Sequence, residues 1–76
     1  GDLMMSKVLY QVRKGTHVQW SLDKYDLQKV TNGNSMIPQL DGVKIEKIKF
    51  DSYKKMVDHM SNIIQLISYL RNRGVN

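Results

Sequence analysis

The last third of the chain carries an apolar stripe that constrains the fold more than any other feature of the sequence. Apolar residues recur there at spacings of three and four, which is the repeat of one side of an α-helix. The stripe consists of Tyr53, Met56, Val57, Met60, Ile63, Ile64, Ile67 and Leu70. Asp51 or Ser52 is a suitable N-cap before it, and Gly74 is a suitable stop after it. We therefore expect a long amphipathic helix over this region.

Residues 7–22 show the period of two that is typical of β-strands. The alternation is interrupted around Gly15, a residue that tolerates the positive φ of a hairpin loop. A loop of three or five residues would place Tyr10 opposite Trp20 and gather both apolar rows on one face, whereas a two-residue Lys14–Gly15 loop would put the rows on opposite faces. We expect the longer loop. Tyr10 and Trp20 then form a core pair under the long helix, rather than exposed platforms for stacking bases.

A short helix is expected after the hairpin, because the alternation stops and helix signals begin. Asp23 is a suitable N-cap, Asp26 is an acid in the first turn, and two helical turns reach Val30. Asn32–Gly33 could instead form a type I′ hairpin turn, but the pairing that this turn implies matches no apolar face. A helix end with Gly33 in the left-handed conformation fits better.

The segment before the long helix predicts a loop and then a third strand. Pro38 and the turn signal Asp41–Gly42 indicate that Met36–Leu40 is a loop or a short edge piece. From Val43 to Phe50 the apolar alternation slips by one position at Glu46–Lys47. One extra residue between two alternating segments is typical of a β-bulge, so we expect a bulged strand.

These elements predict an α+β fold: an N-terminal β-hairpin, a short helix, a third strand, and a long amphipathic helix packed on the sheet as a small two-layer domain. The 76 residues allow one domain, which we place at residues 5–76. Residues 1–4 are typical of a processed or cloned terminus, although the chain could equally be a fragment of a larger protein.

The numbers of Cys and His residues restrict how this chain can be stabilised. A small core usually needs a disulfide, a metal or a partner, but the chain has no Cys and only His17 and His59. Neither a disulfide nor a Cys/His zinc site can form, which leaves packing or self-association as the stabiliser. The absence of Cys favours a reducing, cytoplasmic location. No apolar run has the length of a membrane span, so we expect no membrane partner.

No catalytic motif is present, and we predict a binding protein that is not an enzyme. The chain contains no phosphate-binding glycine loop, no metalloprotease helix motif and no nucleophile elbow. Asp23 and Asp26 are explained as acids in the first turn of a helix. His17 and His59 are expected to be solvated. We therefore predict no catalytic residues, no metal and no small-molecule cofactor.

The charge favours an anionic partner, either nucleic acid or an acidic protein surface. Twelve Lys and Arg residues against seven Asp and Glu residues give a net charge of +5. Our leading hypothesis is nonspecific binding of nucleic acid phosphates. The expected contacts are Arg13, Lys14, Lys44, Lys47, Lys49, Lys54 and Lys55. The alternative is that lysines on an edge strand only prevent aggregation.

A second hypothesis is a protein-interaction module, such as an inhibitor or an adaptor, that acts through the long helix. Leu66 and Tyr69 lie off the apolar stripe near the C-terminal end of the helix, where Arg73 follows. Exposed apolar groups at one end of a helix are typical of a contact site. Homodimerisation is a further possibility through the same helix.

Overall fold

The computed structural model describes residues 7–33 and 36–75, so the expected terminus at residues 1–4 lies outside the described part. The described elements, in chain order, are β1 (Val8–Lys14), β2 (His17–Ser21), α1 (Lys24–Thr31), the 3-10 helix η1 (Pro38–Leu40), β3 (Glu46–Lys49) and α2 (Tyr53–Asn72). The predicted α+β class and the predicted order of hairpin, short helix, third strand and long helix are confirmed. No helix within residues 7–33 and 36–75 is long and apolar enough to cross a membrane.

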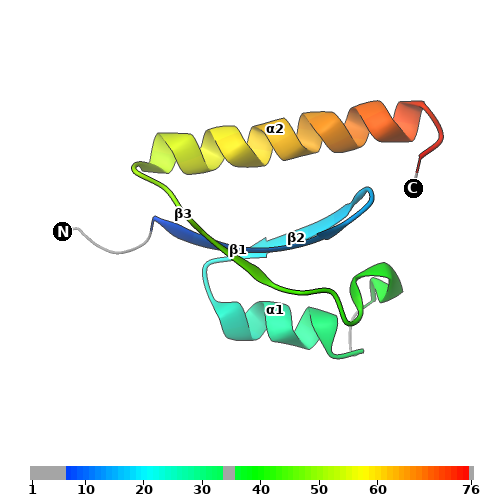
Figure 1. The fold of residues 1–76 in the computed structure, drawn as a ribbon, viewed down its shortest axis with the longest axis horizontal. Helices are drawn as coiled ribbons and strands as arrows, with labels where there is room; N and C mark the ends of the chain where they lie inside the picture. The colour runs from blue at the N-terminus through cyan, green and yellow to red at the C-terminus, as the bar shows by residue number, and fades with distance from the viewer. Residues whose placement is uncertain (1–6, 34–35, 76) are drawn as a thin grey trace.

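The three strands form an antiparallel sheet in the order β2-β1-β3, so β1 is central and both other strands are edges. The long helix α2 lies over one face of the sheet, as expected, and α1 lies against the opposite face (Figure 1). Each face of the sheet therefore carries its own helix.

The hairpin turn is shorter than expected, and the predicted register is wrong. Gly15 and Thr16 form a two-residue turn in which Gly15 has a φ of 61°, and β1 pairs with β2 so that Tyr10 lies opposite Ser21. Trp20 lies opposite Gln11, so the expected Tyr10–Trp20 pair does not exist. Since neighbours along a strand point to opposite faces, Tyr10 points toward α1 and Trp20 points toward α2. The apolar rows are split because both faces are covered.

The face toward α1 holds a closed apolar core. Val12 and Leu40 are fully buried, and Leu27 of α1 packs with them. Half-buried apolar side chains surround these three: Tyr10, Val30, Ile37, Val43 and Ile45. The expected loop or edge piece at Met36–Leu40 therefore contains η1, whose Leu40 is part of the core. Pro at the first position of η1 suits this short turn because it has no N–H to satisfy.

The predicted β-bulge in the third strand is wrong. The strand runs only from Glu46 to Lys49, and the segment 43–45 precedes it without pairing. The backbone alternation is unbroken: Val43 and Ile45 pack on the α1 side, and Ile48, which pairs with Leu9, points to the other face. The apparent slip arises because the apolar residues serve two cores on opposite faces.

Local capping follows the sequence closely. The Asp23 carboxylate accepts a hydrogen bond from the Tyr25 backbone N–H at 2.9 Å, and the Ser52 hydroxyl accepts one from the Lys55 N–H at 3.2 Å. Gly33 ends α1 with a φ of 81°, as expected. At the end of α2, Gly74 has a φ of 79°, and the Val75 N–H donates to the Leu70 carbonyl. These confirmed caps define both ends of α2.

The face toward α2 contains a buried polar group at its centre. Gln11 is 5% exposed, and its Oε1 accepts a hydrogen bond at 2.8 Å from the indole N–H of Trp20. The same oxygen lies 2.8 Å from His59 Nε2. Because Oε1 can only accept, His59 must carry a proton on Nε2. The expectation of a solvated His59 is therefore wrong, and His59 also stacks obliquely on Phe50, at 5.4 Å between ring centroids.

Candidate interaction site

The lysines predicted to bind phosphates occupy three separate places. Lys47 and Lys49 pair with Tyr10 and Val8, so their side chains point to the α1 face of the β3 edge. Lys44 is exposed just before that strand. None of these three lysines forms an ion pair with a carboxylate in residues 7–33 or 36–75. They make a small cationic edge.

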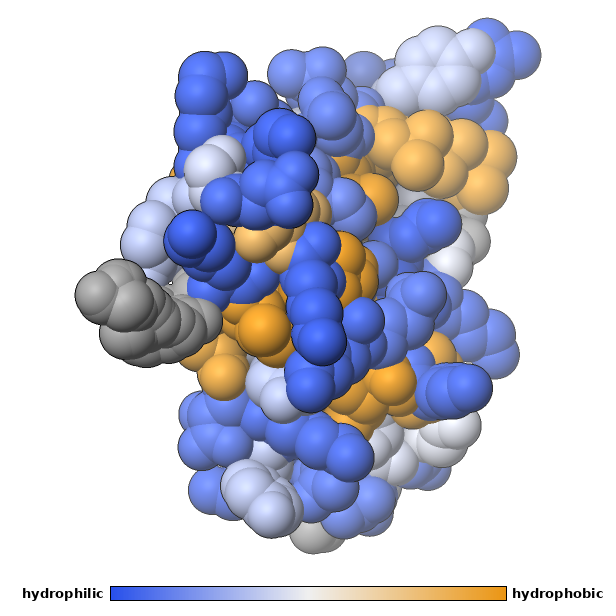
Figure 2. Space-filling view, turned by 60° about the vertical axis from the view of Figure 1, so that its left-hand side comes forward, coloured by the Kyte–Doolittle hydropathy of each residue, from blue (hydrophilic) through white to orange (hydrophobic). Residues whose placement is uncertain are grey.

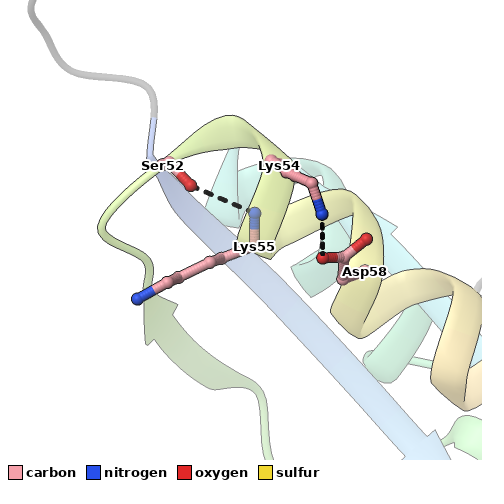
Figure 3. A network of polar contacts seen from close by, with 4 residues as sticks. All are labelled: Ser52, Lys54, Lys55 and Asp58. Carbon is pink, nitrogen blue, oxygen red and sulfur yellow. Dashed lines mark hydrogen bonds and ion pairs between the residues drawn. The ribbon is translucent and has the colours of Figure 1, made fainter.

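Lys54 and Lys55 lie in the first turn of α2, where each is held by an acidic side chain. Lys54 Nζ lies 3.1 Å from Asp58, and Lys55 Nζ lies 3.1 Å from Asp51. Figure 3 shows that the two side chains point away from one another, with Lys55 extending toward the end of β3. These pairs are exposed, so they contribute little stability, but they lower the net charge that this turn presents to an anion.

Arg13 and Lys14 lie at the far end of β1. Val8, the partner of Lys49, is separated from Lys14 by six residues of extended strand, which is about 20 Å. The Arg13 guanidinium donates to the Gly15 carbonyl at 3.1 Å across its own turn. The seven predicted phosphate contacts therefore do not form one continuous face.

The second predicted site, near the C-terminal end of α2, does come together. Leu66, Tyr69 and Arg73 share one side of the helix because they are spaced by three and four residues. Leu66 is 40% exposed and Tyr69 is 58% exposed. The Arg73 guanidinium carbon lies 5.5 Å from the centroid of the Tyr69 ring, a distance typical of a cation–π contact.

A larger apolar surface on α2 is exposed, although the sequence pattern predicted that it would pack in the core. Tyr53, Val57 and Ile64, which we call the open flank, are 56%, 57% and 53% exposed. Only Met56 and Ile67 of α2 are buried. The width of the stripe was the available signal: its residues span about 140° around the helix, whereas one face of a helix needs only about 100° to cover a core.

The open flank borders a groove between α2 and β2. An open apolar hollow of about 290 Å³ is lined by Leu9, Trp20, Ser21, Leu22, Met56 and Met60. A second, separate open hollow of about 310 Å³ lies toward the hairpin turn, and its lining includes Ile64 and Arg71 of α2, residues 16–19 and Ile37. Figure 2 shows apolar surface exposed at the height of α2 and of the sheet below it, between polar side chains. Leu22, at 62% exposure, extends the apolar surface beyond the end of β2.

The two edges of the sheet differ in charge. The β3 edge carries Glu46, Lys47 and Lys49, which is a common way to prevent a strand from pairing with another chain. The β2 sequence His17–Ser21 contains no Asp, Glu, Lys or Arg. The unprotected edge therefore lies beside the groove and the open flank.

No metal-binding cluster is found within the described ranges. No group of three His, Cys, Asp or Glu side chains gathers there in a way that could hold a metal ion. No protein-family model, curated protein or solved structure matches this chain. Only the surfaces of the described residues therefore indicate a function.

Proposed function

We propose that this chain is a protein-interaction module that docks a partner on the open flank of α2 and the adjoining groove. The observation that carries the proposal is the exposure of Tyr53, Val57 and Ile64 along one side of a capped helix. In small proteins, a row of large apolar side chains exposed to water commonly marks a binding surface. Leu66, Tyr69 and Arg73 lie on the opposite side of the same helix and provide a second, smaller contact.

The groove supports a docking function because it combines apolar depth with unpaired backbone. Met60 and Leu22 line its apolar hollow, while the β2 edge offers hydrogen-bonding groups along one wall. Shape and hydrogen bonding together provide the specificity that a flat apolar patch lacks. A partner that covers the flank would remove Val57 and Ile64 from water.

The test is affinity capture from cell extract with the wild-type chain and with the double variant Val57→Glu, Ile64→Glu as baits. We expect the double variant to lose the captured proteins, because each substitution places a charge in the apolar contact. The matched control is Gln65→Glu, which lies on the exposed side of α2. If the wild-type chain captures proteins and the double variant captures the same proteins in equal amount, the open flank is not their docking site. A circular dichroism spectrum of each bait checks that α2 is intact.

A second candidate function is binding of nucleic acid phosphates, favoured by the lysines of the β3 edge. Lys44, Lys47 and Lys49 are exposed and have no acidic partner among the described residues. Phosphate binding of this kind is nonspecific and weakens steeply with salt. Fluorescence anisotropy with a labelled single strand and a labelled duplex, at low and moderate salt, tests it. Changing the three lysines to Glu should abolish a salt-dependent signal, and absence of binding by wild type at low salt would eliminate this function.

A further inference from the structure

We propose that the partner is a second copy of this chain, bound about a two-fold axis that pairs β2 antiparallel with its own copy and packs α2 against α2. This inference rests on the proposed function, because it assigns the occupant of the open flank. The result is a six-stranded sheet with two long helices side by side on one face.

The backbone of β2 has the free groups that this pairing needs. In a two-residue hairpin, the two residues that flank the turn exchange backbone hydrogen bonds, and here these are Lys14 and His17. Farther along the two strands, hydrogen-bonded pairs alternate with pairs that are not hydrogen-bonded. Gln19 and Ser21 therefore bond to β1, while the N–H and C=O groups of Val18 and Trp20 point outward. A two-fold axis at Gln19 places Val18 opposite Trp20 of the second copy, and four hydrogen bonds form.

The distribution of charge favours β2 over β3 as the edge that pairs with a second copy. Two copies of a chain with net charge +5 repel one another, so a symmetric contact must avoid placing like charges face to face. The β2 residues His17–Ser21 include no Lys or Arg, whereas pairing β3 with itself would bring Lys47 and Lys49 against their own copies. Only β2 can pair with itself without that repulsion.

The position of α2 fits the same symmetry. An axis perpendicular to the sheet keeps both helices on the same face. The helix contacts β1 through His59 and Gln11, and its Met60 lines one hollow together with Trp20 of β2. A helix above the gap between β1 and β2 lies about one strand spacing, ~4.8 Å, from the axis, so the two helices would be about 9.6 Å apart. Packed helices are about 8–10 Å apart.

The area that the dimer would bury fits a weak, reversible contact. The open flank runs from Tyr53 to Ile64, which is about 18 Å of helix, so a flank about 10 Å wide presents roughly 180 Å². The edge of a five-residue strand adds roughly 170 Å². Two copies would bury about 700 Å² in total, which is typical of weak, transient interfaces.

Dimerisation would also complete a core that the single chain leaves unfinished. On the α2 side the fully buried apolar residues of the described chain are Leu9, Met56 and Ile67. Val18 and Trp20 of β2 remain half-exposed. Small domains without disulfides or metals often gain their missing stability from a second subunit.

The first experiment is sedimentation equilibrium of the wild-type chain from about 5 to about 500 μM, a range that spans micromolar dissociation constants. We expect a monomer–dimer equilibrium. Gln19→Lys should weaken it by about tenfold or more, because two lysines would meet across the axis. The same substitution at Gln65, on the exposed side of α2, is the matched control and should leave the dimer unchanged.

The second experiment uses the absence of native cysteine. Gln19→Cys places a thiol opposite its own copy at a non-hydrogen-bonded position, within the separation that a disulfide spans. Oxidised glutathione should convert this variant to a covalent dimer. Glu46 lies opposite Gln11 of β1 and is the equivalent position on the β3 edge. The variant Glu46→Cys should therefore remain a monomer. Equal crosslinking of both variants would overturn the assignment of the β2 edge.

The outcomes separate this inference from the function on which it rests. A wild-type chain that stays monomeric up to the highest concentration overturns the dimer. If the open-flank double variant still loses captured proteins in that case, the docking function stands with a different partner. If it loses none, the docking function falls as well. A dimer that Gln19→Lys weakens and Gln65→Lys does not supports both.

Discussion

The two faces of the sheet are built in different ways. On the α1 side, three small elements surround Val12, Leu27 and Leu40, and these side chains are almost completely removed from water. On the α2 side, a helix of 20 residues buries only Met56 and Ile67, the centre holds the polar Gln11, and the open flank faces solvent. The longer helix covers less of its own sheet than its stripe would allow.

The length and periodicity of a helix therefore do not reveal how much of it belongs to the core. The short helix α1 is closed off by η1 and by segment 43–45, which pack around it. No described segment covers α2 from outside. We infer that the α1 face stabilises the chain and that the α2 face is available for recognition.

The largest effect is expected from the closed core. Leu40→Ala should lower the free energy of unfolding by about 2–5 kcal/mol, because it removes a fully buried side chain and leaves a cavity. A domain of this size has a total stability of only about 3–5 kcal/mol, so the variant should be largely unfolded at room temperature. Urea unfolding followed by circular dichroism measures this. A loss below about 1 kcal/mol would mean that the α1 face does not hold the fold together.

The polar centre of the α2 face should have the next largest effect. Gln11→Leu removes the acceptor for Trp20 and His59, and we expect a loss of about 1–3 kcal/mol. The fluorescence of Trp20, the only tryptophan, reports the change in its surroundings during urea unfolding. Gln65→Leu on the exposed side of α2 is the control and should change stability by less than about 0.5 kcal/mol. If both variants lose the same unfolding free energy, the hydrogen bonds of Gln11 do not stabilise the fold.

The cap of α2 should have a smaller effect. Ser52→Ala removes the acceptor for the Lys55 N–H, and we expect a loss of about 1 kcal/mol in thermal unfolding followed by circular dichroism. Ser61→Ala, within the same helix and exposed, should be neutral or slightly stabilising, because Ala is the better helix former. If both variants behave alike, the first turn of α2 does not depend on its cap.

The smallest effect is expected on the open flank of the monomer. Ile64→Ala should change the free energy of unfolding by less than about 1 kcal/mol in dilute solution, because the side chain is already largely in water. Ile67→Ala, three residues along the same helix and buried, should cost about 2–5 kcal/mol. A large loss for Ile64→Ala under monomeric conditions would place the flank in the core and contradict the division between the two faces.

Features that depend on near neighbours in the chain were predictable. The Asp23 and Ser52 caps, the glycine ends of both helices and the strands of the hairpin each depend on residues within a few positions of one another. The cation–π contact of Tyr69 with Arg73 is of the same kind, because helical spacing places both on one side of α2.

The candidate site was only partly predictable. The exposure of Leu66 and Tyr69 followed from their positions off the stripe. The exposure of Val57 and Ile64 did not, because it depends on where the sheet ends beneath the helix. The contact between Gln11 and His59, which are 48 positions apart, leaves no local pattern in the sequence.

Turns, caps and helical periodicity act over a few residues, so the elements, their order and the ends of the helices could be predicted from the sequence alone. Which side of each strand is buried depends on the tertiary structure. The wrong hairpin register and the wrong bulge at Glu46–Lys47 have one cause, the assumption that the sheet has a single apolar face. An alternating strand shows which residues share a side, but whether one side or both are covered depends on helices distant in the chain, here α1 and α2.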